Sequence, residues 1–223
     1  MKSTFMYLTA AVAVMAMASC GSNATEAGAA DSTLSATEGS ATYTITPTSV
    51  LGWKGTKIVG EGAHAGTIAM TNGTISMENG NITAGTVTID MKNIVVTDSG
   101  MADEYKQKLI GHFSADDFFN TEKFPTSKFE ITGSEAKVDG AYTHVISGNL
   151  TLRDSTKNIS FPATVAVTET GLTAVGTATI NRLDWGVNYD KDKMSLTEKL
   201  QASAKNGIVS KDMEITFNIT ATK

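Results

Sequence analysis

Apolar residues alternate with threonine, serine, asparagine and lysine through most of the chain beyond Thr42. This period of two is typical of a β-strand with one buried and one solvated face. Threonine takes many of the outward positions, where a β-branched side chain suits a pleated surface. The pattern therefore predicts an antiparallel sheet. The clearest strands are expected at residues 87–91, 128–132, 149–152, 164–168, 178–180 and 214–219.

Two asparagine–glycine pairs are candidate turns between these strands. Asn79-Gly80 predicts a two-residue hairpin turn, because both central residues of such a turn have positive φ. Asn72-Gly73 leaves two interpretations open, a second turn or a glycine kink within one long bent strand. At least eight strands with short connections favour a closed antiparallel barrel or a sandwich, and the periodicity alone does not choose between them.

Two stretches interrupt the strand pattern with helical composition. Asp103–Leu109 predicts a short helix, and Ser114–Asp117 resembles an N-cap arrangement that opens a turn carrying two phenylalanines. Ser195–Glu198 resembles a capping box before a second short helix over 199–205, which Asn206-Gly207 would end. We therefore expect an all-β domain with short helices in its connections.

The N-terminus has the layout of a secretory signal. Lys2 precedes an apolar run from Phe5 to Met17, and this run of about 13 residues is shorter than the roughly 20 that span a bilayer. Met17–Cys20 resembles the lipobox of bacterial lipoproteins, whose cysteine becomes the lipid-modified first residue. We expect a signal peptide over residues 1–19, a lipidated Cys20, and a protein anchored in the bacterial cell envelope at its periplasmic or outer-membrane face. The alternative is an ordinary signal peptide with an unrelated cysteine.

Residues 21–42 are almost wholly small and polar, with Leu34 as their one large apolar residue. Such a segment buries too little apolar surface to offset the entropy of ordering. We therefore expect residues 20–42 to form a lipidated, disordered tether that lets the domain stand away from a membrane. The remaining residues, 43–223, fit one domain.

Composition and motifs argue against several classes of function. The formal net charge of −5, from 23 acidic and 18 basic residues, offers no electrostatic reason to bind nucleic acid. The zinc-protease, serine-hydrolase and Walker motifs are all absent from the sequence. His64, His112 and His144 have no short metal-ligand spacing, so no metal site is predicted, although folding could still bring the three together. The enzymatic alternative would use His112 with Asp116 or Asp117.

The densest apolar cluster of the chain is rich in phenylalanine, with five of the eight phenylalanines between residues 113 and 129. One interpretation is that these rings belong to the core and pack a helical turn over the end of a barrel. The other is that they line the mouth of an apolar cavity. The two interpretations are compatible.

Four ordered motifs resemble the YceI-like family of polyisoprenoid-binding proteins. They are Tyr43–Ser49, Leu109–Phe129, Ser147–Asp154 with Lys157 and Pro162, and Ile180–Val187. The resemblance covers the chain from about Tyr43 to its end. It implies a closed, lipocalin-like antiparallel β-barrel of about eight strands that holds an isoprenoid chain along its axis. The insertion 191–211 departs from the family pattern and leaves the length and identity of the lipid open.

The resemblance implies non-catalytic binding, and sequestration or transport, of a long apolar lipid of the polyisoprenoid or isoprenoid quinone class. No cofactor is required beyond that lipid, and whether the protein forms a homodimer stays open. The alternative is a surface-displayed barrel that binds protein or glycan and holds no internal ligand. The apolar lining expected for the lipid site is Trp53, Ile68, Met70, Phe113, Phe118, Phe119, Phe124, Phe129, Leu150 and Trp185.

Two polar residues are candidates for contact with a lipid head group. His112 lies within the phenylalanine-rich motif, and Arg182 follows the strand that ends near Ile180. Arg182 has an alternative role as a hydrogen-bonded clamp across strands. The expected partners are therefore a membrane, through Cys20, and a long-chain apolar lipid.

Overall fold

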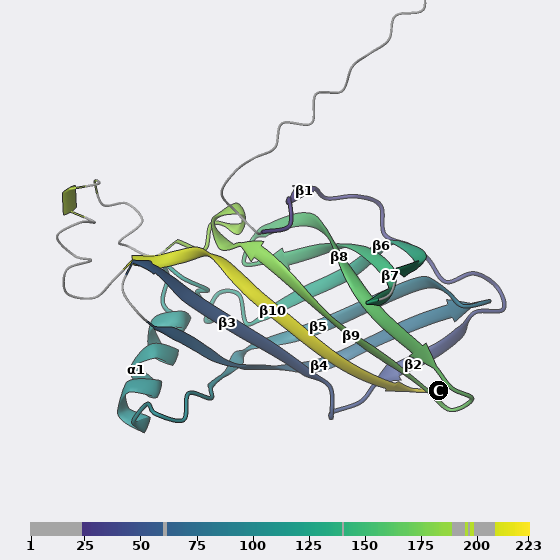
Figure 1. The fold of residues 1–223 in the computed structure, drawn as a ribbon, viewed down its shortest axis with the longest axis horizontal. Coiled ribbons are helices and arrows are strands. Elements are labelled where there is room, and N and C mark those ends of the chain that lie inside the picture. Colours follow the sequence, from purple (N-terminus) through teal and green to yellow (C-terminus); the bar gives the residue numbers. More distant parts are fainter. Residues whose placement is uncertain (1–23, 60–61, 140, 189–194, 196, 199–207) are drawn as a thin grey trace, which may run out of the picture.

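The computed structural model describes residues 24–59, 62–139, 141–188, 195, 197–198 and 208–223. Eight long strands form the body of the molecule (Figure 1). They are β3 (Val50–Val59), β4 (Ala63–Glu78), β5 (Asn81–Val96), β6 (Thr126–Asp139), β7 (Tyr142–Leu152), β8 (Ser155–Val167), β9 (Gly171–Asn181) and β10 (Ile208–Thr222).

These strands form a closed antiparallel barrel. Each of β3 to β9 pairs with the next strand along the chain, and β10 pairs with both β9 and β3. A sandwich would leave the first and last strands unpaired with each other, so the pairing of β3 with β10 decides for the barrel. The expected strands 87–91, 128–132, 149–152 and 214–219 all lie within this barrel.

Strand β9 shows how the alternating sequence builds the wall. Leu172, Ala174, Ala178 and Ile180 are buried, whereas Thr173 and Thr177 between them are exposed. Because successive side chains of a strand point to opposite faces, the apolar set faces the barrel interior and the threonines face solvent.

The two asparagine–glycine pairs have different roles. Asn79 and Gly80 have φ values of 51° and 82° and join β4 to β5, which confirms the hairpin turn. At Asn72-Gly73, β4 continues without a turn and carries a register shift between Met70 and Asn72. A Cβ on Gly73 would lie 2.5 Å from Ile45 Cδ1, so the glycine admits that side chain.

The helices lie at one end of the barrel, which we call the α1 end. Helix α1 (Asp103–Ser114) follows β5, and the 3₁₀ helix η1 (Arg182–Trp185) follows β9. In Figure 1, α1 lies at the left-hand end and the C-terminus lies near the right-hand end, which we call the far end. None of the helices among the described residues is long and apolar enough to cross a membrane.

The two predicted capping motifs fare differently. Ser114 belongs to the last turn of α1, where its hydroxyl donates to the carbonyl of Ile110 at 3.0 Å, so its prediction as an N-cap was wrong. Ser195 and Glu198 exchange the two hydrogen bonds of a capping box, at 2.7 and 3.3 Å. Hydrogen bonds that the Ser195 hydroxyl and backbone N–H donate to the Glu198 carboxylate lower the pKa of that carboxyl. The helix predicted over 199–205 lies outside the described residues.

The segment before the barrel runs along its outer wall. Thr25 N donates to Thr179 O at 2.6 Å. Strand β1 (Gly28–Ala29) pairs with β8, and β2 (Ala41–Ile45) then pairs with β4 and β10. Figure 1 shows this segment, in purple, passing from β1 toward the far end before it enters β2. We call residues 24–40 the strap.

The strap differs from the unattached tether that its composition suggested. Asp31 and Asn149 form two hydrogen bonds of 3.0 and 2.7 Å, and Leu34 N donates to Ile131 O at 2.9 Å. Ile131 follows the last β6 residue that pairs with β5. The strap therefore donates a hydrogen bond to a β6 carbonyl at the point where the pairing of β6 with β5 ends. The strap is thus held by backbone and amide hydrogen bonds to the sheet, which a count of apolar residues does not register.

Candidate functional site

An apolar cavity of about 130 Å³ runs inside the barrel, and we call it the axial cavity. Its lining comes from all eight barrel strands, from Met213 and Leu152 near the α1 end to Val165 and Ile219 toward the far end. Thr86 and Ser127 are the polar side chains in this lining, and the Ser127 hydroxyl donates to the Thr151 carbonyl. With no charged lining group among the described residues, this cavity suits a hydrocarbon and offers no group for acid–base chemistry.

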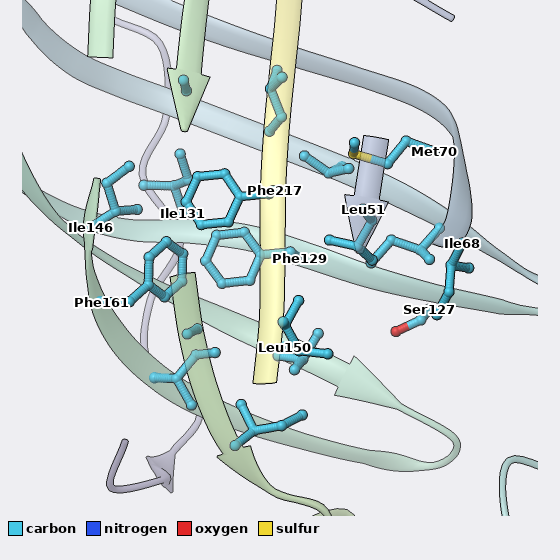
Figure 2. Close-up of a pocket in the computed structure, with 18 of the residues that line it drawn as sticks. Leu51, Ile68, Met70, Ser127, Phe129, Ile131, Ile146, Leu150, Phe161 and Phe217 are labelled. Carbon is cyan, nitrogen blue, oxygen red and sulfur yellow. The ribbon is translucent and has the colours of Figure 1, made fainter. Parts of the chain in front are cut away.

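Three phenylalanine rings meet within the axial cavity (Figure 2). The ring of Phe161 lies 5.5 Å from that of Phe129 and 5.2 Å from that of Phe217, measured between centroids. Glycines stand opposite two of these rings, because a Cβ on Gly148 would overlap Phe129 and a Cβ on Gly176 would overlap Phe217. The two glycines let the rings lie back against the wall, which keeps the axis open for a slender chain.

Aromatic rings also close the barrel at its α1 end. Phe118 and Phe119 are buried and pack edge to face at 4.7 Å, and Phe113 lies 5.2 Å from Phe118. Trp53 of β3 packs edge to face on Phe113 at 5.0 Å. Arg153 Nη1 donates to the carbonyls of Phe118 and Gly186, each at 2.9 Å, which ties this aromatic cap to the residue after η1.

A second cavity of about 280 Å³ lies on the outer side of the aromatic cap, and we call it the vestibule. Its polar lining consists mainly of hydrogen-bond donors, and among the described residues it includes no carboxylate. Met213 lines both cavities, and the neighbours Phe118 and Phe119 line the vestibule and the axial cavity respectively. The polar residues of the vestibule are Trp53, Thr56, Lys57, His64, His112, Arg182 and Ser210.

Arg182 is 1% exposed and has the clamp geometry that was one of its two expected roles. Its Nε donates to Ser210 O of β10 at 3.2 Å, and its Nη1 donates to Val187 O at 2.8 Å. The guanidinium carbon also lies 5.8 Å from the Phe118 ring centroid. Arg182 therefore joins η1, β10 and the aromatic cap while one side of it lines the vestibule.

The two tryptophans differ in how their indole N–H groups are satisfied. Trp185 is 1% exposed and its Nε1 donates to Leu150 O at 2.8 Å. Trp53 is 5% exposed, lines the vestibule, and its Nε1 has no hydrogen-bond partner among the described residues. A buried indole N–H usually finds an acceptor, so Trp53 Nε1 is a donor in the wall of the vestibule whose hydrogen bond is still to be made.

The residues expected to bind lipid divide between the two cavities. Ile68, Met70, Phe119, Phe129 and Leu150 line the axial cavity. The vestibule is lined by Trp53, Phe113, Phe118 and both head-group candidates, His112 and Arg182. Phe124 and Trp185 line neither cavity, and the Phe124 ring instead lies 4.9 Å below Lys123 Nζ.

Several lining residues were not singled out from the sequence. Phe161, Phe217 and Leu51 line the axial cavity, and Lys57, His64 and Ser210 line the vestibule. The residues of the axial cavity could have been found from the alternation of inward and outward side chains along their strands. The second group had no such signal, because strand register and the position of α1 bring those residues together.

The histidines do not come together as a three-histidine site. His64 Nδ1 lies 2.7 Å from Asp98 Oδ2, whereas His144 lies in β7 within 3.3 Å of the Gly80 carbonyl at the far end. Among the described residues, no group of three or more histidine, cysteine or acidic side chains could hold a metal ion. Asp116 and Asp117, the acids of the enzymatic alternative, line neither cavity.

A family model of the YceI-like domain matches residues 43–221. The chain belongs to the YceI-like family. The match begins at Tyr43, so it covers β3 to β10 and leaves out the strap. No match was found among curated proteins.

Two solved structures have the same fold as this YceI-like chain. BcnA of Burkholderia cenocepacia is 17% identical with a TM-score of 0.59, over 78% of this chain and 96% of that protein. A polyisoprenoid binding domain from Saccharophagus degradans, implicated in plant cell wall breakdown, is 16% identical with a TM-score of 0.51, over 81% of this chain and 97% of that domain. At these identities the likeness establishes the shared barrel.

Proposed function

We propose that this protein binds one long, slender apolar lipid of the polyisoprenoid or isoprenoid quinone class, without chemical conversion. The observation that carries the proposal is the axial cavity, which all eight strands line and whose polar lining is limited to two hydroxyls. An eight-stranded barrel is wide enough to hold one small or slender ligand. Membership of the YceI-like family and the polyisoprenoid binding described for the Saccharophagus domain support this class of ligand.

Burial of the hydrocarbon would supply most of the affinity. Each methylene moved from water into the axial cavity contributes about 0.8 kcal/mol, so a chain of many methylenes needs few polar contacts. The donors of the vestibule, including Trp53 Nε1, would then contact the polar head. Met213 lines both cavities, so one molecule would occupy both once the rings of the aromatic cap move aside.

The proposal places the protein in the bacterial cell envelope, anchored through acylated Cys20. The support is the signal-like run from Phe5 to Met17 and the lipobox-like Met17–Cys20. In that setting the barrel would sequester or transport a lipid that is insoluble in the aqueous phase.

Mass spectrometry of an organic extract tests this function directly. Protein isolated from its native envelope should release a prenyl lipid in close to stoichiometric amount, and added polyprenol should raise the Tm of stripped protein. An apolar dye should also enter the stripped barrel and be displaced by polyprenol. An extract free of prenyl and acyl lipid, together with an unchanged Tm, would favour the barrel that binds protein or glycan at its surface.

A further inference from the structure

The strap shortens the connection between the barrel and Cys20. If residues 20–42 were free, about 22 residues would separate anchor and domain, with a reach of up to roughly 75 Å. In the structure the strap is bonded to the barrel from Thr25 onward. Only four residues separate Thr25 from Cys20, and the five residue-to-residue steps span at most about 18 Å. An acyl group on Cys20 would thus hold the barrel close to the bilayer.

The position of Thr25 selects which part of the barrel is held. Thr25 bonds to Thr179, two residues before β9 ends and η1 begins, and β1 pairs with Asn158 and Lys157 near the start of β8. Both attachment points belong to the halves of β8 and β9 that lie toward the α1 end.

Exposed apolar side chains gather at the same end. Of the eight large hydrophobic residues that are exposed among the described residues, Ile58, Val95, Tyr105 and Leu183 belong to the α1 end. Ile58 and Tyr105 are the most exposed of the eight, at 67% and 61%. Val50 and Val167 are the two at the far end. The α1 end therefore exposes more large apolar side chains than the far end does, which favours it over the far end for contact with a bilayer.

We propose that the α1 end of the barrel rests on the surface of a lipid bilayer, with Ile58, Val95, Tyr105 and Leu183 in contact with it. This orientation rests on the proposed acylation of Cys20, and it adds to the proposed function the surface with which the barrel exchanges its lipid. The vestibule lies at this same end and shares Met213 with the axial cavity. Once the rings of the aromatic cap move aside, lipid would pass between bilayer and barrel through the vestibule, without crossing water.

Two valines provide a matched pair of reporter positions. Val95 at the α1 end and Val167 at the far end are 49% and 46% exposed, and neither lines a cavity. Val95→Cys and Val167→Cys are made separately in the full chain and purified from membranes, so that acylation of Cys20 leaves the new cysteine as the one free thiol. Each is labelled with an environment-sensitive fluorophore and reconstituted in phosphatidylcholine vesicles that contain a doxyl-labelled lipid.

We expect the doxyl lipid to quench the label at position 95 at least twofold more than the label at position 167. Replacing residues 25–31 with a glycine–serine segment of the same length removes the side chains and the regular pairing that hold Thr25, β1 and Asp31 to the barrel, and the longer free connection to Cys20 should reduce this contrast. Ser147→Ala removes the hydroxyl bond between Ser147 on β7 and Ser160 on β8 and leaves the bonds of the strap in place, so it should preserve the contrast.

Three results would overturn the orientation. Equal quenching at the two positions, or stronger quenching at 167, would show that the α1 end does not face the bilayer. No quenching at either position would show that neither end of the barrel contacts the bilayer. The intact mass of the exported protein separates the anchor from the orientation, because unmodified Cys20 removes the basis for both, whereas acylated Cys20 with equal quenching rejects the orientation alone.

Discussion

The axial cavity and the vestibule share Met213 but are built from different parts of the fold. The axial cavity is formed by regular strands whose inward side chains are apolar, with Phe119 as its contribution from the aromatic cap. The vestibule combines the ends of β3, β4 and β10 with α1 and η1, and it contains the donors of Trp53, Lys57 and Arg182. The free energy of hydrocarbon burial adds up along the lipid chain and does not depend on the head group. A hydrogen-bond donor, in contrast, recognises one acceptor atom of the lipid. Under the proposed function, affinity would therefore come mainly from the axial cavity and head-group selectivity from the vestibule.

The largest effect is expected from filling the axial cavity. Ala178 on β9 is buried and faces the cavity, so Ala178→Phe would exclude about four methylenes of the ligand. At about 0.8 kcal/mol each this is about 3 kcal/mol, or a more than one-hundredfold increase in Kd. Titration with polyprenol and with squalene, an isoprenoid hydrocarbon without a head group, should show the same loss for both.

The neighbouring residue supplies the control for that variant. Thr177 is exposed on the same strand, so Thr177→Phe adds the same ring outside the barrel and should leave Kd within about twofold. If Ala178→Phe bound polyprenol as tightly as the wild type while remaining folded, the ligand would have to lie outside the axial cavity.

A smaller effect is expected from pushing one aromatic ring toward the axis. A Cβ on Gly148 would overlap the Phe129 ring, so Gly148→Ala should displace that ring into the cavity. Overpacking of this kind costs about 1–3 kcal/mol, and we expect a lower Tm together with about a tenfold weaker affinity. Thermal denaturation and the same lipid titration measure the two effects.

Gly133 on β6 is the matched glycine for this comparison. A Cβ there would meet Ser147 Cβ at 3.6 Å, an ordinary contact, and Gly133 lines neither cavity. Gly133→Ala should therefore change lipid affinity by less than twofold. Equal effects of the two substitutions would mean that the Phe129 ring does not limit the width of the cavity.

The two cavities also differ in how far the sequence predicted them. Alternation in β9 predicted the wall of the axial cavity, because a strand's parity decides which side chains face inward. For the vestibule, His112 and Arg182 were proposed from a family resemblance, and Lys57 and His64 were not singled out. Their meeting depends on the register of β3 with β4 and on the packing of α1, which local patterns do not encode.

The strap shows a second limit of sequence reasoning. Its composition is that of a linker, yet Asp31 and Leu34 are fixed by bonds to Asn149 and Ile131. The acceptor on β6 is available because the β5–β6 ladder ends at Glu130. The partners of a polar segment exist only in the folded sheet and cannot be seen in its composition. A prediction based on apolar content alone therefore gave disorder.

The smallest effect, and the one that tests the vestibule by itself, is expected from the two tryptophans. Trp53→Phe removes the unpartnered Nε1 donor and keeps a ring against Phe113. Because one hydrogen bond contributes about 1 kcal/mol, affinity for a lipid with an acceptor head should fall about fivefold, while affinity for squalene stays unchanged. Trp185→Phe instead removes the bond to Leu150 O and should lower the free energy of unfolding by about 1 kcal/mol without altering the preference between the two lipids. Equal losses for polyprenol and squalene in Trp53→Phe would place the head group away from the vestibule and remove the division of roles between the two cavities.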